Sequence, residues 1–115
     1  MQKQENPEAS ENMELYSALG KSFELRRQDI ISFAEIKKQV EAVIRELLNK
    51  NMEKLLSVLY RIDVDQKKTD SIFSIGSKDD MARLLAEAVI ERQLEKIKTR
   101  KKYREEIHSE RNRLE

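Results

Sequence analysis

Glycine and proline are scarce in this sequence of 115 residues, which contains two glycines and one proline. Turns that need a positive φ or a fixed φ are therefore few, and architectures of many short strands joined by tight turns are not expected. Charged residues make up 39% of the chain and aromatic residues 5%, which is typical of helices with a large solvated surface. We expect an all-α fold of one domain.

The clearest predicted helix begins after Ser32, because Ser32 and Glu35 have the spacing of a capping box. One apolar stripe then continues to about Asn49. A second apolar stripe, from Met52 to Ile62, would be rotated by roughly a quarter turn if the first helix continued without interruption. The sequence therefore predicts a break at residues 49–51.

Residues 65–74 predict a short helix that places Ile72 and Phe73 on the core. Ser77 is then a candidate N-cap for the last helix, with acidic residues in the first turn, where the helix dipole favours them. Residues 78–115 contain no glycine or proline. We expect a small helical hairpin or bundle with a long charged C-terminal helix, whose second half is a partly coiled-coil-like extension.

The N-terminal region gives weaker signals. Residues 1–12 are rich in polar residues, and we expect a disordered tail. Residues 13–31 contain Leu19 and Phe23 at helical spacing, but Gly20 interrupts them, so a marginal helix and an extended arm both stay open. We assign residues 32–104 to the helical domain and residues 105–115 to a charged helix end.

The last predicted helix has two apolar faces. A first set of residues, Met81, Leu84, Leu85 and Ala88, lies on one side of it. Ile90, Leu94 and Ile97 lie on nearly the opposite side. Because one hairpin buries only the first set, the second set is a candidate partner face. It could be covered by the N-terminal arm, by a second copy of the chain or by a foreign partner.

Residues 96–104 are the most basic segment of the chain, with six basic residues and no acidic one. The candidate basic patch is Lys96, Lys98, Arg100, Lys101, Lys102 and Arg104. Such cations can follow a phosphate backbone. In a helix, however, they are spread around the circumference, and Glu105 and Glu106 can pair with Lys101 and Lys102. A solvated or partner-binding face is the main interpretation, and nucleic acid is the alternative.

Charge is divided along the chain. Residues 1–32 carry four basic and six acidic groups, a net charge of −2, whereas residues 78–104 carry nine and five, a net charge of +4. The whole chain has a net charge of +1. A globally basic nucleic-acid binder is therefore not indicated.

Catalytic and metal-binding patterns are incomplete. The chain has no cysteine, which excludes disulfides and thiolate metal sites. His108 is its only histidine and lies among charged residues. Residues 20–22 imitate the end of a phosphate-binding loop, but Leu15 stands where that loop needs glycine. Asp63 and Asp65 imitate the start of a calcium loop whose later ligand positions are lysines. We expect no enzyme activity, no cofactor and no metal.

No apolar run approaches the roughly 20 residues that span a bilayer. The polar N-terminus lacks the apolar segment of a secretory signal. We therefore expect a cytoplasmic protein without a membrane partner.

Two strings, LLSVLYRIDV at residues 55–64 and AVIERQLEKIKTR at residues 88–100, resemble a group of short bacterial helical proteins of the Bacteroidetes type. The resemblance covers roughly residues 33–104. It implies a small, cytoplasmic, helical protein and assigns no catalytic residue. Within these strings, we expect Arg61 or Arg92 to pair with a carboxylate near a hairpin end and fix the register of the helices. A docking spot for a partner is the alternative.

Together these patterns predict a protein–protein interaction or assembly module, with a homodimer through Ile90, Leu94 and Ile97 as one form. A nucleic-acid accessory protein that uses residues 96–104 is the alternative.

Overall fold

The computed structural model describes residues 9–23 and 32–114, and this part of the chain forms five helices and no strand. The helices are α1 (Ala9–Phe23), α2 (Phe33–Lys50), α3 (Met52–Ile62), α4 (Gln66–Phe73) and α5 (Lys78–Leu114). The prediction of an all-α fold with a long C-terminal helix is confirmed.

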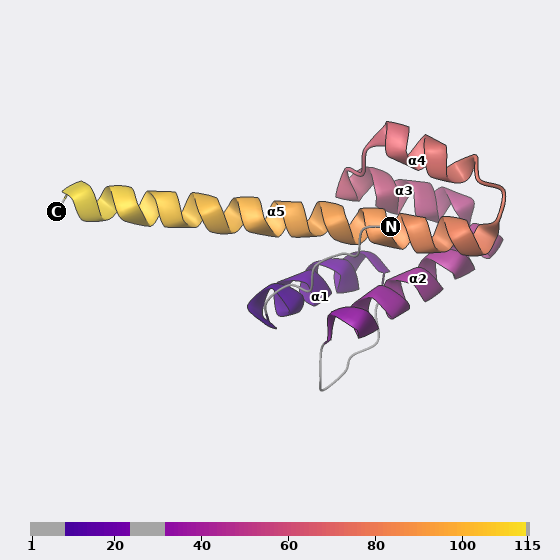
Figure 1. Ribbon diagram of the computed structural model, residues 1–115, viewed down its shortest axis with the longest axis horizontal. Helices are drawn as coiled ribbons and strands as arrows, with labels where there is room; N and C mark the ends of the chain where they lie inside the picture. Colours follow the sequence, from indigo (N-terminus) through magenta and orange to yellow (C-terminus); the bar gives the residue numbers. More distant parts are fainter. Residues whose placement is uncertain (1–8, 24–31, 115) are drawn as a thin grey trace.

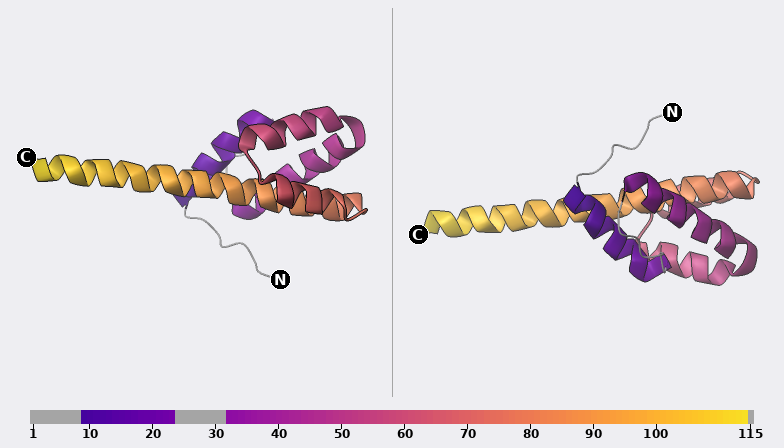
Figure 2. Two further views of the ribbon diagram at one scale, coloured as in Figure 1. Left: turned by 90° about the horizontal axis from the view of Figure 1, so that it is seen from above. Right: turned by 90° about the horizontal axis from the view of Figure 1, so that it is seen from below.

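The first half of α5 is the axis of the body (Figure 1). In that view, α3 and α4 lie on one side of α5, and α1 and α2 lie on the other. Beyond the contact of Arg104 with α1, the C-terminal part of α5 extends away from the other helices, as both further views show (Figure 2). This extension makes the molecule 58 Å long but only 34 Å by 29 Å in the other directions.

The core lies where α2, α3 and α5 meet. Val40, Ile44, Leu55, Leu85 and Val89 are fully enclosed there. The buried stripe of α5 ends at Ile97, and residues 98–106 are exposed. It ends because the next positions on the same side of the helix carry charged residues that remain solvated.

Capping residues set the boundaries of α2 and α3 as predicted. The Ser32 hydroxyl accepts a hydrogen bond from the Glu35 amide at 3.1 Å. Asn51 ends α2, since its amide donates to the Leu47 carbonyl at 2.8 Å. The same residue begins α3, since its side-chain oxygen accepts from the Lys54 amide at 3.1 Å. The predicted break at residues 49–51 is therefore confirmed. It occurs because Asn51 is both the C-cap of α2 and the N-cap of α3.

The boundaries of α4 and α5 follow the same chemistry. Asp63 ends α3 in the left-handed region, with φ of 67°. The Asp65 carboxylate accepts from the Lys67 amide at 3.0 Å and begins α4. The Ser77 hydroxyl accepts from the Asp80 amide at 3.4 Å at the start of α5. The predicted short helix is confirmed, with Ile72 buried and its neighbour half-buried.

The N-terminal predictions are corrected in part. Helix α1 begins at Ala9, so residues 9–12 belong to a helix and not to a disordered tail. Of the two alternatives for residues 13–31, residues 13–23 are helical. Residues 1–8 and 24–31 lie outside the described part of the chain. Leu15, Leu19 and Phe23 repeat every fourth residue and are buried, and this packing outweighs the low helix propensity of Gly20.

Candidate interaction surfaces

The three residues of the candidate partner face are buried within the single chain. Ile90 is 0% exposed, Leu94 8% and Ile97 1%. They belong to the same core cluster as the buried residues of α1 and α2. In this conformation the three residues are covered within the chain, in agreement with the first of the three alternatives for this face, the N-terminal arm.

The helix that covers the end of this face is α1. Helix α2 runs antiparallel to α5, because Arg45 pairs with Asp79 whereas Lys37, nearer the start of α2, pairs with Glu87 at 3.5 Å. Helix α2 therefore begins about one turn beyond the level of Glu87. Further along α5, Arg104 pairs with Glu14 of α1 at 3.7 Å. Leu94 and Ile97 lie between these levels, where α1 rests against α5 (Figure 1).

Helix α1 packs as an amphipathic helix. Leu15, Leu19 and Phe23 are 3% exposed or less, whereas Met13 is exposed. These three residues form one stripe on a 3.6-residue helix. We call the Ile90, Leu94 and Ile97 side of α5 the α1 flank. The helix that occupies the α1 flank has three apolar side chains at four-residue spacing and a carboxylate near Arg104.

Four polar side-chain atoms of α1 and α2 are buried without a hydrogen bond in the described part of the chain. They are Glu11 Oε2, Asn12 Oδ1 and both side-chain polar atoms of Gln39. Gln39 lies on α2 one turn before Val43, which lines a surface pocket together with Ser22 of α1. Gln39 is therefore on the side of α2 that faces α1. A buried polar group without a partner costs about 1–3 kcal/mol.

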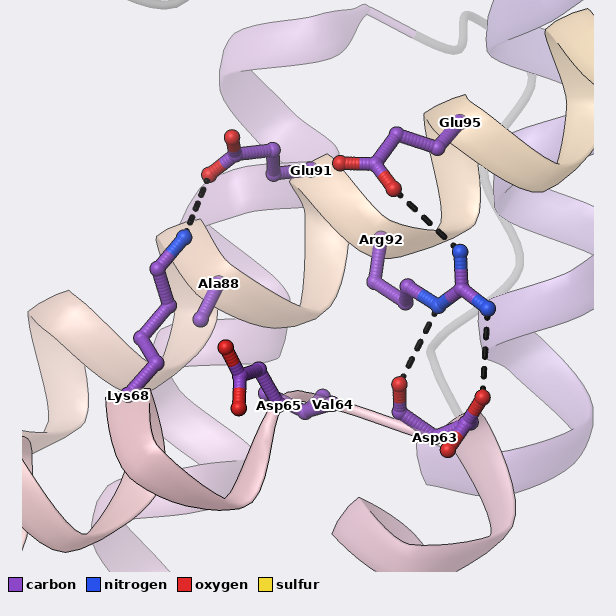
Figure 3. A pocket seen from close by; sticks show the side chains of 8 residues that line it. All are labelled: Asp63, Val64, Asp65, Lys68, Ala88, Glu91, Arg92 and Glu95. Carbon is purple, nitrogen blue, oxygen red and sulfur yellow. Dashed lines mark hydrogen bonds and ion pairs between the residues drawn. The ribbon is translucent and has the colours of Figure 1, made fainter.

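The opposite side of α5 makes directed polar contacts with the end of α3 (Figure 3). The Arg92 guanidinium donates to the Asp63 carbonyl at 3.1 Å and to the Asp63 carboxylate at 3.2 Å. It also pairs with Glu95 at 3.2 Å. Lys96 Nζ donates to the Ile62 carbonyl. We call the side that carries Arg92 and Lys96 the α3 flank.

These contacts explain the ion pair that the sequence suggested. The last carbonyls of a helix have no partner inside the helix, and cations near them are favoured by the helix dipole. The prediction that Arg92 pairs with a carboxylate near a hairpin end is confirmed. Arg61, the other candidate for this pairing, is exposed.

A cleft of about 400 Å³ lies beside these contacts, between α5 and the junction of α3 and α4. Lys68 of α4 pairs with Glu91 of α5 across it at 3.2 Å (Figure 3). The cleft is lined by four acidic and two basic residues, so its ion pairs leave a net negative charge. Asp63 and Asp65, which imitate a calcium loop in the sequence, are the caps of α3 and α4. Among the described residues, no group of three or more possible ligands is placed to hold a metal ion.

The candidate basic patch is divided by contacts within the chain. Lys96 is bound to the end of α3, and Arg104 is paired with Glu14. Lys98, Arg100 and Lys102 are exposed on α5. The six cations therefore do not act as one surface.

An exposed apolar stripe on α3 was missed from the sequence. Met52, Leu56 and Tyr60 are 42%, 48% and 88% exposed, and they repeat every fourth residue on one face. The sequence predicted one apolar stripe from Met52 to Ile62, whereas α3 buries Leu55 and Val58 and leaves Leu56 exposed. The sequence did contain a signal for this stripe, because the apolar residues of α3 cover more of the helix circumference than one buried face can hold.

Comparisons with protein-family models, with curated proteins and with solved structures give no match to this chain. The resemblance to short bacterial helical proteins stays a prediction. Within residues 9–23 and 32–114, no helix is both long enough and apolar enough to cross a membrane.

Proposed function

We propose that the protein is a helical protein–protein interaction module, and that it acts by binding rather than by catalysis. The observation that carries this proposal is the seating of α1 on α5. An amphipathic helix lies on the apolar α1 flank, with Leu15, Leu19 and Phe23 enclosed. The anchors of α1 have the spacing that is used in helix-in-groove recognition, in which residues three and four apart anchor the ligand helix.

The chain's own α1 is the natural competitor of any partner helix. A tethered ligand has an effective concentration in the millimolar range when its linker is short. A free helix of the same pattern must therefore compete with α1 and binds weakly to the intact chain. Removing the anchors of α1 should open the flank to that helix.

A labelled peptide of residues 9–23 tests this proposal by fluorescence anisotropy. We expect weak binding to the wild-type chain and binding roughly tenfold to a hundredfold tighter to the full-length double variant Leu15→Asp/Leu19→Asp, because the tethered competitor is lost. Met13→Asp is the matched control, since it places the same charge on the exposed side of α1. This variant should bind like wild type.

Equal binding to the double variant and to wild type would overturn the proposal. A helical circular dichroism spectrum of the double variant shows that the rest of the chain is folded. Adding Leu94→Asp to the double variant should abolish binding of the peptide, because that substitution puts a charge into the α1 flank.

The exposed cations of α5 favour a second candidate function, contact with nucleic acid. Lys98, Arg100 and Lys102 are exposed on a helix that projects from the body. Binding through three phosphate contacts should weaken with salt, with a slope of roughly −2 to −3 in log K against log salt concentration. No retention on single- or double-stranded nucleic acid at low salt would remove this candidate.

A further inference from the structure

We propose that the helix bound to the α1 flank in an assembly is α1 of a second copy, so that two chains exchange α1 reciprocally. This inference rests on the proposed function, because it identifies the helix that binds to the α1 flank. Exchange of an identical element between copies is a low-cost route to a dimer, since each contact of the closed chain is made again.

The contacts of α1 make its release inexpensive. The ion pair between Glu14 and Arg104 joins side chains that are 44% and 64% exposed, and such exposed pairs contribute little. The buried polar atoms of Glu11, Asn12 and Gln39 lack hydrogen bonds in the described part of the chain. When α1 leaves, water can reach these atoms, which offsets part of the lost apolar contact.

The position of α1 in the body permits exchange without disturbing other packing. Helix α1 packs mainly on α5 and α2. The contacts of α2 with α5, and those of Arg92 and Lys96 with the end of α3, do not involve α1. The remaining helices therefore keep their arrangement when α1 moves to another chain.

A second copy fits the α1 flank better than a foreign partner for two reasons. It carries the same stripe of Leu15, Leu19 and Phe23 and the same Glu14 for Arg104. Its acidic N-terminal region, with a net charge of −2 over residues 1–32, is also attracted to the region 78–104 of the other chain, with a net charge of +4. Any foreign helix would have to reproduce both features.

The absence of cysteine from the sequence allows a direct test. Two full-length variants, Glu14→Cys and Arg104→Cys, are mixed, equilibrated and treated with a short bismaleimide linker. Exchange joins α1 of one chain to α5 of the other. We expect a linked product that contains one chain of each variant, with twice the 13.6 kDa mass of one chain.

Random collision is controlled by pairing Tyr60→Cys with Arg104→Cys, because Tyr60 is 88% exposed on α3. We expect roughly tenfold more linked product from the Glu14 and Arg104 pair than from this control. The double variant Glu14→Cys/Arg104→Cys shows that the linker spans the contact within one chain.

Two results overturn exchange. One is linking in the double variant but none between the mixed single variants, and the other is equal product in the mixture and in the collision control. Tight peptide binding to Leu15→Asp/Leu19→Asp together with either result would leave the helix-binding function in place and remove only the second copy as its partner. Failure of the peptide experiment would remove both.

Discussion

The two flanks of α5 hold their neighbours by different physics. On the α3 flank, Arg92 and Lys96 reach named carbonyl and carboxylate oxygens at the end of α3. On the α1 flank, three apolar side chains of α1 are buried, while polar atoms of Glu11 and Asn12 are enclosed without partners in the described residues.

This difference matters because the two kinds of contact specify different things. A guanidinium that bridges a carbonyl and a carboxylate fixes one register, since a shift by one residue breaks both hydrogen bonds. Apolar burial is non-directional and depends mainly on the area removed from water. We therefore expect the α3 flank to be the permanent part of the body and the α1 flank to be the part that opens.

A matched pair of core substitutions gives the largest expected effect. Leu85 and Leu19 are both 0% exposed. Leu85→Ala should lower the free energy of unfolding by about 2–5 kcal/mol, because it leaves a cavity where α2 and α5 meet. Leu19→Ala should lower it by less than about 2 kcal/mol, because release of α1 limits the loss.

Urea denaturation followed by circular dichroism measures both losses. Equal losses for the two variants would contradict the idea that α1 is separable, and would place α1 in the same cooperative unit as the core.

Removal of the α3-flank guanidinium is expected to have an intermediate effect. Arg92→Ala should cost about 1–2 kcal/mol, because hydrogen bonds to charged groups are lost at a half-buried site. Arg61→Ala is the control, since Arg61 is an exposed arginine in the last turn of α3, and it should change stability by less than about 0.5 kcal/mol. Equal effects of the two variants in thermal denaturation would show that Arg92 does not fix the end of α3.

The smallest expected effect is a stabilisation of helix α1 itself. Gly20 lies inside α1, and a Cβ atom added there meets nothing within 4 Å. Gly20→Ala should stabilise α1 by about 0.5–1 kcal/mol, because glycine is a poor helix former. Gly76→Ala is the contrasting variant, since φ is +91° at Gly76 and the substitution is strained there. We expect hydrogen exchange in α1 to become slower in Gly20→Ala and to stay unchanged in Gly76→Ala.

Much of the fold could be predicted because its signals are local. The caps at Ser32, Asn51 and Ser77 follow from side-chain chemistry within three residues along the chain. The pairing of Arg92 was also predictable as a cation near an acidic helix end. The start of α1 at Ala9 was not, because residues 9–12 become helical through packing of later residues.

The candidate site could be predicted only in part because its contacts are not local. Ile90, Leu94 and Ile97 were identified as a face that needs a cover, and the N-terminal arm was one of three covers left open. No residue pattern decided among them. The contact of Lys96 with the end of α3 could not be predicted, because its acceptor is the backbone carbonyl of Ile62 and every residue has such a carbonyl. Lys96 therefore resembled the other cations of residues 96–104.

Native-state hydrogen exchange of the wild-type chain tests the separability of α1 most directly. We predict that the amides of α1 exchange through an opening that costs well below the free energy of global unfolding, while those of α2 and the first half of α5 exchange only through global unfolding. If the amides of Leu15, Leu19 and Phe23 were protected as strongly as those of Ile44 and Leu85, α1 would be a permanent part of the core and would not separate from it.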